Sequence, residues 1–134
     1  MASTGARGFE DLEIYRISEQ LADAIWDFVI RWKSTAQDTV GKQLIRAADS
    51  IGANIAEGTG RGSYRDNHRF VDIARGSLYE TRHFLRRAFR RKLLTTEQVN
   101  QLRPLIEELG PRLNAYRNSL RARQRTKPQV TSNK

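Results

Sequence analysis

The sequence contains no cysteine, which excludes a disulfide framework and any metal site built on thiolate ligands. It has no run approaching the roughly 20 apolar residues that a membrane-spanning helix requires. Residues 1–8 also lack the apolar stretch of a secretory signal. A reducing intracellular compartment is the simplest explanation of these absences. We therefore predict a cytoplasmic protein with no membrane association.

Residues suited to catalysis are also scarce. The two histidines, His68 and His83, lie in one predicted helix, and neither has the spacing of a metal motif. We expect His83 to face the interior of the fold and His68 to face solvent. The glycines of residues 58–62 follow a helix and lack the Lys-Ser/Thr ending of a phosphate-binding loop. No nucleophile lies beside a base, so we predict a protein that is not an enzyme and has no catalytic residues, metal or cofactor.

Four segments repeat apolar residues at the spacing of an α-helix, and none alternates as a strand would. They run approximately over residues 10–32, 40–57, 63–92 and 95–121. Their apolar stripes are Ile14, Ile17, Leu21, Ile25, Phe28 and Trp32; Leu44, Ala48, Ile51 and Ile55; Phe70, Ile73, Ala74, Ser77, Leu78, Phe84, Leu85 and Ala88; and Val99, Leu102, Ile106, Leu109, Leu113 and Leu120.

Local residues indicate where these helices begin and end. The polar stretch 33–39 predicts a loop, and the glycines of 58–62 predict a helix end closed by a left-handed residue. Ser63 is a candidate N-cap, and Thr95 with Gln98 has the spacing of a capping box. Pro104 and Pro111 interrupt the fourth pattern without ending it, which predicts one bent helix.

Because every predicted connection is short, consecutive helices should pack antiparallel. The predicted fold is therefore all-α, an antiparallel up-down four-helix bundle over residues 9–122. A flexible N-terminus, residues 1–8, precedes the bundle. A disordered basic tail, residues 123–134, follows it.

Positive charge is unevenly distributed along the chain. The formal net charge is +9, but residues 1–33 contain six acids and four bases and so contribute −2, which leaves +11 for the remainder. An asymmetric field of this kind attracts polyanions. A merely soluble surface would give the same composition.

The strongest charge feature is residues 82–92, which contain six bases and no acid. Helical spacing places Arg82, Arg86 and Arg90 along one ridge, and Arg87 and Arg91 along the next. We predict phosphate contacts here and at the start of the third helix, from Arg61, Arg65, Arg82, Arg86, Arg87, Arg90, Arg91 and Lys92. The alternatives are a solvated arginine face, or one paired with acidic residues across a protein interface.

A second set of polar residues falls at i, i+3 spacings near the predicted core. Asn54 and Glu57 lie on the second helix, and Ser77 and Glu80 lie on the third. Because buried polar groups need partners, we predict that these four form one internal hydrogen-bonded cluster with a nearby arginine, Arg46 or Arg75. Such a cluster would fix the register of the bundle.

Several blocks of the sequence together resemble one protein family. They are Phe9-Glu10-Asp11-Leu12 with Tyr15; Arg46-Ala47-Ala48, Ser50-Ile51 and Ala53-Asn54-Ile55-Ala56-Glu57-Gly58; Gly60-Arg61, Ser63, Arg69-Phe70, Ile73-Ala74, Gly76-Ser77-Leu78-Tyr79-Glu80 and Leu85; and Gly110, Leu113, Asn114 and Leu120. The chain is similar from Phe9 to Leu120 to the bacterial four-helix bundle proteins encoded in intervening sequences of 23S rRNA genes. Their relatives include the accessory variability protein of diversity-generating retroelements.

The resemblance implies a ring-shaped homopentamer that associates with nucleic acid or, in the retroelement branch, with a reverse transcriptase. The predicted function is therefore a non-enzymatic, homo-oligomeric protein that binds an RNA or DNA backbone. The alternative is a protein–protein scaffold or accessory subunit. Two departures from the family pattern are Gly52, where members usually carry proline, and the prolines at 104 and 111.

Overall fold

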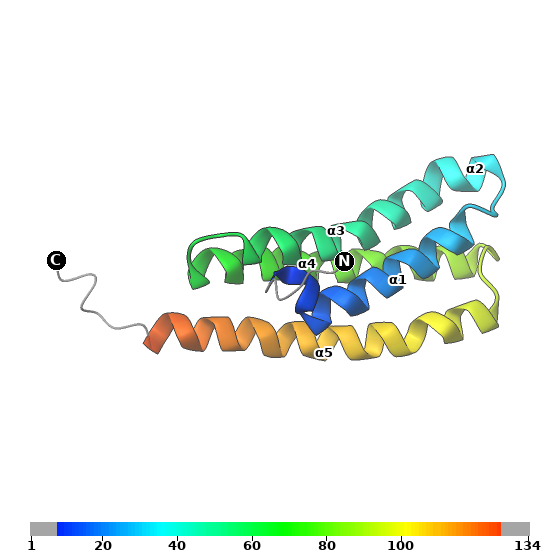
Figure 1. The fold of residues 1–134 in the computed structure, drawn as a ribbon. Coiled ribbons are helices and arrows are strands. Elements are labelled where there is room, and N and C mark those ends of the chain that lie inside the picture. The colour runs from blue at the N-terminus through cyan, green and yellow to red at the C-terminus, as the bar shows by residue number, and fades with distance from the viewer. Residues whose placement is uncertain (1–7, 127–134) are drawn as a thin grey trace.

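The computed structural model describes residues 8–126, and within them every regular element is a helix, with no strand. Four long helices are joined by short connections (Figure 1), so the all-α prediction is confirmed. The elements are the 3-10 helix η1 (Phe9–Asp11), α1 (Glu13–Val29), the single turn α2 (Ser34–Ala36), the π-helical turn η2 (Gln37–Gly41), α3 (Lys42–Thr59), α4 (Tyr64–Arg90) and α5 (Thr96–Thr126).

Side-chain contacts fix the directions of the helices. The end of α3 meets the start of α4, where Gly58 lies against Asn67. The start of α4 in turn meets the second half of α5, where Asn67 Nδ2 donates to the Tyr116 hydroxyl at 3.2 Å. Consecutive long helices therefore run in opposite directions (Figure 1).

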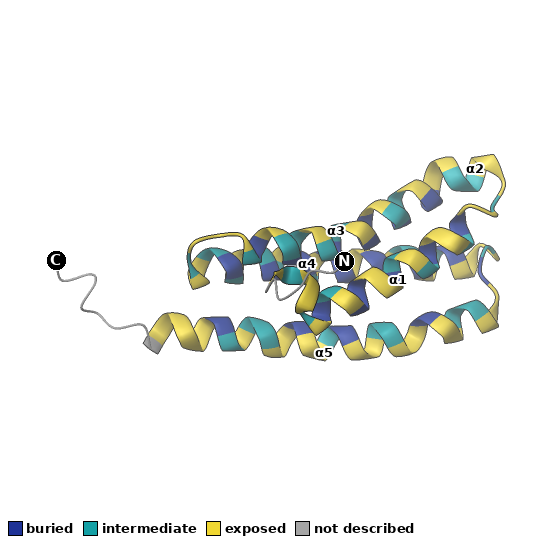
Figure 2. Ribbon diagram, in the orientation of Figure 1, coloured by how far each residue is buried: buried dark blue, intermediate teal, exposed yellow. Residues whose placement is uncertain are grey.

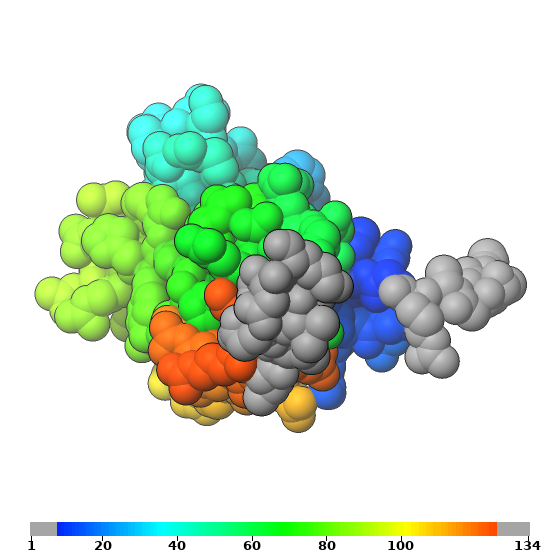
Figure 3. All heavy atoms as spheres, turned by 90° about the vertical axis from the view of Figure 1, so that its left-hand side faces the viewer, coloured from blue at the N-terminus to red at the C-terminus, as the bar shows by residue number. Residues whose placement is uncertain are grey.

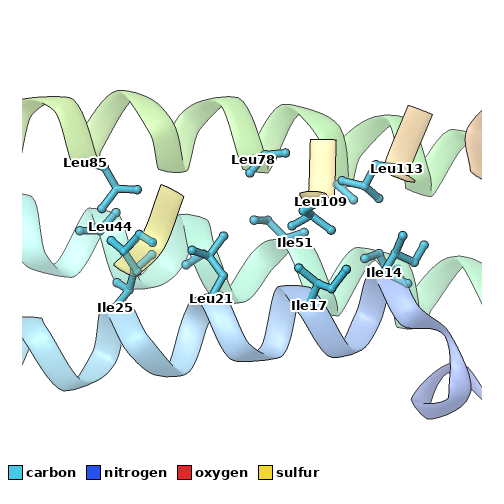
Figure 4. Close-up of a cluster of buried hydrophobic side chains, with 14 of the residues drawn as sticks. Ile14, Ile17, Leu21, Ile25, Leu44, Ile51, Leu78, Leu85, Leu109 and Leu113 are labelled. Atoms are coloured by element: carbon cyan, nitrogen blue, oxygen red, sulfur yellow. The ribbon is translucent and has the colours of Figure 1, made fainter. Parts of the chain in front are cut away.

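One continuous core lies between the four helices, and the buried positions form a stripe along each of them (Figure 2). Leucine and isoleucine side chains from all four meet there (Figure 4), and Leu21, Ile51, Ile55, Leu109 and Leu113 are completely buried. Burial of each such side chain contributes about 1.5–3 kcal/mol. One predicted core residue is misplaced, since Ile73 is 43% exposed. It lies one position before Ala74, about 100° around the helix from the buried stripe.

Two of the predicted helix boundaries are confirmed by hydrogen bonds. The Ser63 hydroxyl accepts from the Asp66 amide at 3.1 Å and caps α4. Thr95 and Gln98 form both bonds of a capping box at the start of α5, each at 3.0 Å. These bonds satisfy amides that have no partner within their own helix.

Two predicted connections differ from the structure. Residues 34–41 are helical and lead directly into α3, because the Gln37 side-chain amide donates to the carbonyls of Val29 and Ile30 and ties this turn to the end of α1. Gly60, after α3, is right-handed with φ −81°, since the amides of Gly60 and Arg61 close the helix through 3-10 bonds instead. The left-handed non-glycine residue of the described chain is Lys92, with φ 64°, after α4.

Helix α5 continues through both internal prolines as one gently curved helix (Figure 1). Pro104 and Pro111 are exposed, and so are Asn100 and Glu107, the residues whose carbonyls lose their amide partners to the prolines. The predicted disordered tail is wrong for residues 123–126, which belong to α5, and its remainder lies outside the described residues. Of the predicted flexible N-terminus, only Gly8 falls within the described residues. No helix within residues 8–126 is both long and apolar enough to cross a membrane.

Gly58 allows the closest approach between α3 and α4. A β-carbon at this buried position would lie 2.5 Å from Asn67 Oδ1 and 3.0 Å from Phe70 Cβ. The Asn67 side chain is buried and held by Tyr116, and the Phe70 atom is next to the backbone, so neither neighbour moves easily. Gly76, in the exposed middle of α4, has open space around its own position.

We predict opposite effects of alanine at these two glycines. Gly58→Ala should lower the free energy of unfolding by about 1–3 kcal/mol, because the added methyl group overpacks the contact between the helices. Gly76→Ala should raise it by about 0.5–1 kcal/mol, because alanine favours an exposed helix interior. Urea denaturation followed by circular dichroism measures both, and a stabilised Gly58→Ala variant would contradict the proposed contact.

Candidate nucleic-acid interface

The arginine ridge is the set Arg82, Arg86, Arg87, Arg90, Arg91 and Lys92, and it occupies the last turns of α4 and the residues that follow. Arg87 is partly buried and the other five are exposed. The core side of this part of α4 is formed by Leu85 and Ala88, which are buried. Packing of these two residues therefore turns the basic side chains of the ridge outward.

None of the six ridge residues forms an ion pair with a carboxylate of the described chain. Arg82 lies 5.5 Å from the centre of the exposed Tyr79 ring, which is a cation–π contact. By contrast, Arg16, Arg75, Arg112 and Arg117 are all paired within the molecule. The arginines of the ridge thus present guanidinium groups that no carboxylate of residues 8–126 neutralises, and such groups suit bidentate contacts with phosphate oxygens.

An apolar groove of about 420 Å³ lies beside the ridge, between α4 and α5. Leu85, Phe89, Val99, Leu102 and Ile106 supply its apolar lining. Arg82 and Arg86 of the ridge line it as well, together with Arg103, Glu107 and Thr96. The ridge therefore borders a surface that has both positive charge and exposed apolar area.

The other two predicted phosphate contacts lie far from the ridge. Arg65 precedes Arg86 by 21 positions on the same helix, which corresponds to about 32 Å along its axis. Arg61 is already engaged, since it forms an ion pair with Glu57 at 2.9 Å and lies over the Phe70 ring at 4.8 Å. The structure therefore separates the predicted basic residues into two groups at opposite ends of α4.

A carboxylate that sequence reasoning missed joins α4 to α5. Asp72 Oδ1 accepts from Arg117 Nε of α5 and lies 3.5 Å from Arg75 Nη1. Its other oxygen, Oδ2, lies 3.6 Å from His68 Nδ1. The i+4 and i+3 spacings that relate Asp72 to His68 and Arg75 are visible in the sequence, but the partner from α5 is 45 residues away.

The positions predicted for the two histidines are reversed. His68 is only 15% exposed in its side chain and lies against α5, whereas His83 is exposed. Burial lowers the pKa of His68 from its ordinary value, Arg117, Arg121 and Arg75 lower it further, and Asp72 opposes them. His68 Nε2 is buried and has no hydrogen-bond partner among the described residues.

The predicted internal polar cluster does not form. Ser77 is buried, but Arg46, Glu57 and Glu80 are exposed and Asn54 is partly buried. Their hydrogen bonds and ion pairs are local: Arg46 donates to Gln43, Asn54 donates to the Ser50 carbonyl, and Glu57 pairs with Arg61. The i, i+3 spacing placed each pair on one face of its own helix, but the faces on α3 and α4 do not point toward each other.

Chemistry based on a metal has no evident site in the part of the chain that the structure describes. No group of three or more histidine or carboxylate side chains lies close enough together there to hold an ion. The features with clear chemical consequences are therefore the ridge, the groove beside it and the network around Asp72.

We predict that Asp72→Asn destabilises the fold by about 1–2 kcal/mol, because Arg117 loses a charged hydrogen-bond acceptor between α4 and α5. It should also lower the pKa of His68 further, since Asp72 is the group that raises it. Chemical denaturation and an NMR pH titration measure the two effects. Glu108→Gln is the control and should change stability by less than about 0.5 kcal/mol, because the exposed Arg112 keeps its pair with Glu13.

Stability should also depend on pH through His68. Its folded pKa lies below the ordinary value of 6.5, so the unfolded chain binds more protons near and below that pH. The free energy of unfolding therefore rises with pH between the folded pKa of His68 and 6.5. The same stabilisation is lost as the pH falls from 6.5 toward the folded pKa. His68→Gln should flatten the dependence between about pH 5 and 7, whereas His83→Gln should not. Equal slopes in the wild type and the His68→Gln variant would contradict this assignment.

A comparison of the chain with models of protein families gives a match to 23S rRNA-intervening sequence protein over residues 10–115. This interval covers α1, α3, α4 and the first two thirds of α5. A search of curated protein sequences gave no match. The matched interval also contains most of the sequence blocks that resemble this family, together with the whole arginine ridge. The chain belongs to the 23S rRNA-intervening sequence protein family.

Proposed function

We propose that this protein is a non-enzymatic, homo-oligomeric binding protein that contacts the phosphate backbone of RNA or DNA through its arginine ridge. The observation that carries the proposal is that six neighbouring basic residues have no carboxylate partner in the described chain. Keeping like charges at i, i+4 spacing costs helix stability, and a polyanion would offset that cost.

The expected mode of binding is electrostatic and independent of sequence. Arginine guanidinium groups on an exposed helix face can contact the oxygens of successive phosphates, and counterions are then released from the nucleic acid. The net charge of +9 adds a long-range attraction that is screened by salt. A homo-oligomer would multiply the number of ridges that contact one strand, which raises avidity. The proposed pentameric state rests on the family resemblance.

A second candidate function is a protein–protein scaffold or an accessory subunit, for example of a reverse transcriptase. The observation that favours it is the apolar groove beside the ridge. Trp26 lies on α1 and Ile30 directly follows this helix, and both side chains are about half exposed. The acidic residues Asp23 and Asp27 are close to them in the sequence. A surface of that kind is complementary to the groove and its arginines, so the ridge would then lie at a protein interface.

We predict that Arg86→Gln combined with Arg90→Gln weakens binding to structured RNA and duplex DNA. The plot of log affinity against log salt concentration has a negative slope. The magnitude of this slope should become smaller by about 1 for each phosphate group that the variant no longer binds. Glutamine keeps the helix propensity of arginine, so the fold should be unchanged. Filter binding at several salt concentrations measures both the affinity and the slope.

The matched control is Arg16→Gln combined with Arg112→Gln, which removes the same charge from arginines that are already paired. It should change affinity much less than the ridge variant. Sedimentation velocity of both variants separates the two candidate functions. Loss of the oligomer in the ridge variant alone favours the scaffold, and wild-type binding that is absent or insensitive to salt refutes the backbone-binding proposal.

A further inference from the structure

A second basic site lies at the end of the molecule away from the ridge. The first turns of α4 and the last turns of α5 lie side by side there (Figure 3). A hollow of about 580 Å³ between them is lined by Arg65, His68, Arg121, Gln124 and Arg125. We call this the end pocket. Its lining residues include three arginines and a histidine, and no acidic residue.

Tertiary packing brings these charges together. Arg65 and His68 belong to α4, and the other basic residues come from α5, more than 50 positions later. None of Arg65, Arg121 and Arg125 has an ion-pair partner in the described chain. The nearby acids are already engaged, since Asp72 binds Arg75 and Arg117 and Asp66 lies 4.0 Å from Arg69.

His68 reports the electrostatic character of this site. Its ring is held beside Asp72 through Nδ1, while its buried Nε2 has no partner among the described residues. After burial, the arginines at 117, 121 and 75 are what lower the pKa of His68, against the opposing effect of Asp72. Because three arginines and no carboxylate line the pocket, a bound anion would reduce the repulsion among its positive charges.

We propose that the end pocket binds a terminal phosphate group, a phosphate monoester that carries close to two negative charges. Three guanidinium groups offer more donors than the two free oxygens and single charge of a backbone phosphodiester can use. A terminal phosphate presents three oxygens, and only one side of it is attached to a larger group. The natural source of such a group is the end of a nucleic-acid strand, and this part of the assignment rests on the proposed function.

Strand-end recognition is tested with one 12-nucleotide single-stranded RNA carrying a phosphate at its 5′ end, at its 3′ end or at neither. We expect one phosphorylated form to bind the full chain about tenfold more tightly than the form without phosphate, which is the effect of one charge-assisted hydrogen bond. Arg65→Gln combined with Arg121→Gln should abolish this preference. Arg86→Gln combined with Arg90→Gln should lower all affinities and leave the preference intact.

The pocket itself is tested without nucleic acid, with inorganic phosphate as the probe at constant ionic strength. The two histidines report on the two basic sites, because His68 lines the end pocket and His83 lies between Arg82 and Arg86 in the sequence of the ridge segment. We expect phosphate to shift the NMR signals of the His68 ring saturably and to raise its pKa, with smaller changes at His83. Arg65→Gln combined with Arg121→Gln should remove the His68 response while circular dichroism shows an unchanged fold.

The outcomes separate this inference from the proposed function. A His68 response to phosphate in a protein that binds no nucleic acid supports the pocket and refutes the backbone-binding proposal. A His68 response with no preference among the three RNAs refutes strand-end recognition and identifies free phosphate or a nucleotide as the source. Salt-dependent RNA binding with no His68 response and no terminal preference overturns the pocket.

Discussion

The close approach of α3 and α4 is the constraint on which the rest of the structure depends. Gly58 removes the β-carbon that would collide with Asn67 and Phe70, and Ala47, Ala48, Ala74 and Ala88 are buried small residues along the same two helices. Because these side chains are short, the helices lie close enough for the larger side chains of α1 and α5 to complete one core. The direction of α4 then determines which of its faces reach α5 and which reach solvent.

This packing determines which residues of α4 face the core, which face α5 and which face solvent. Its core side repeats every seven residues through Asn67, Ala74, Thr81 and Ala88, all buried. A second side meets α5, where Asp72 holds Arg117 and the ring of His68 is enclosed. The remaining surface carries arginines near both ends of the helix that have no ion-pair partner within residues 8–126. Charged side chains on the α5 side of α4 thus stabilise the contact between the two helices. The arginines on its remaining surface are available to a ligand.

The two basic sites at opposite ends of one helix are the basis for the proposed extended polyanionic partner. The ridge is exposed and linear, which matches a repeating backbone. The end pocket is concave and formed by two helices, which matches a single group with concentrated charge. The match over residues 10–115 places this chain in the 23S rRNA-intervening sequence protein family, while the proposed ligands rest on the chemistry of these two sites.

The sequence by itself determined the helical class, most of the core, the Ser63 cap, the capping box at Thr95 and the ridge, because all of these depend on local periodicity and nearest neighbours. Only the tertiary structure decided that residues 34–41 are helical, that His68 is enclosed and that the predicted cluster around Ser77 does not form. It alone paired Asp72 with Arg117, and placed Arg65 with Arg121 and Arg125 around one pocket. Periodicity identifies which face of a helix is buried, but the partner of that face depends on how distant segments pack, and spacing along one helix carries no information about another.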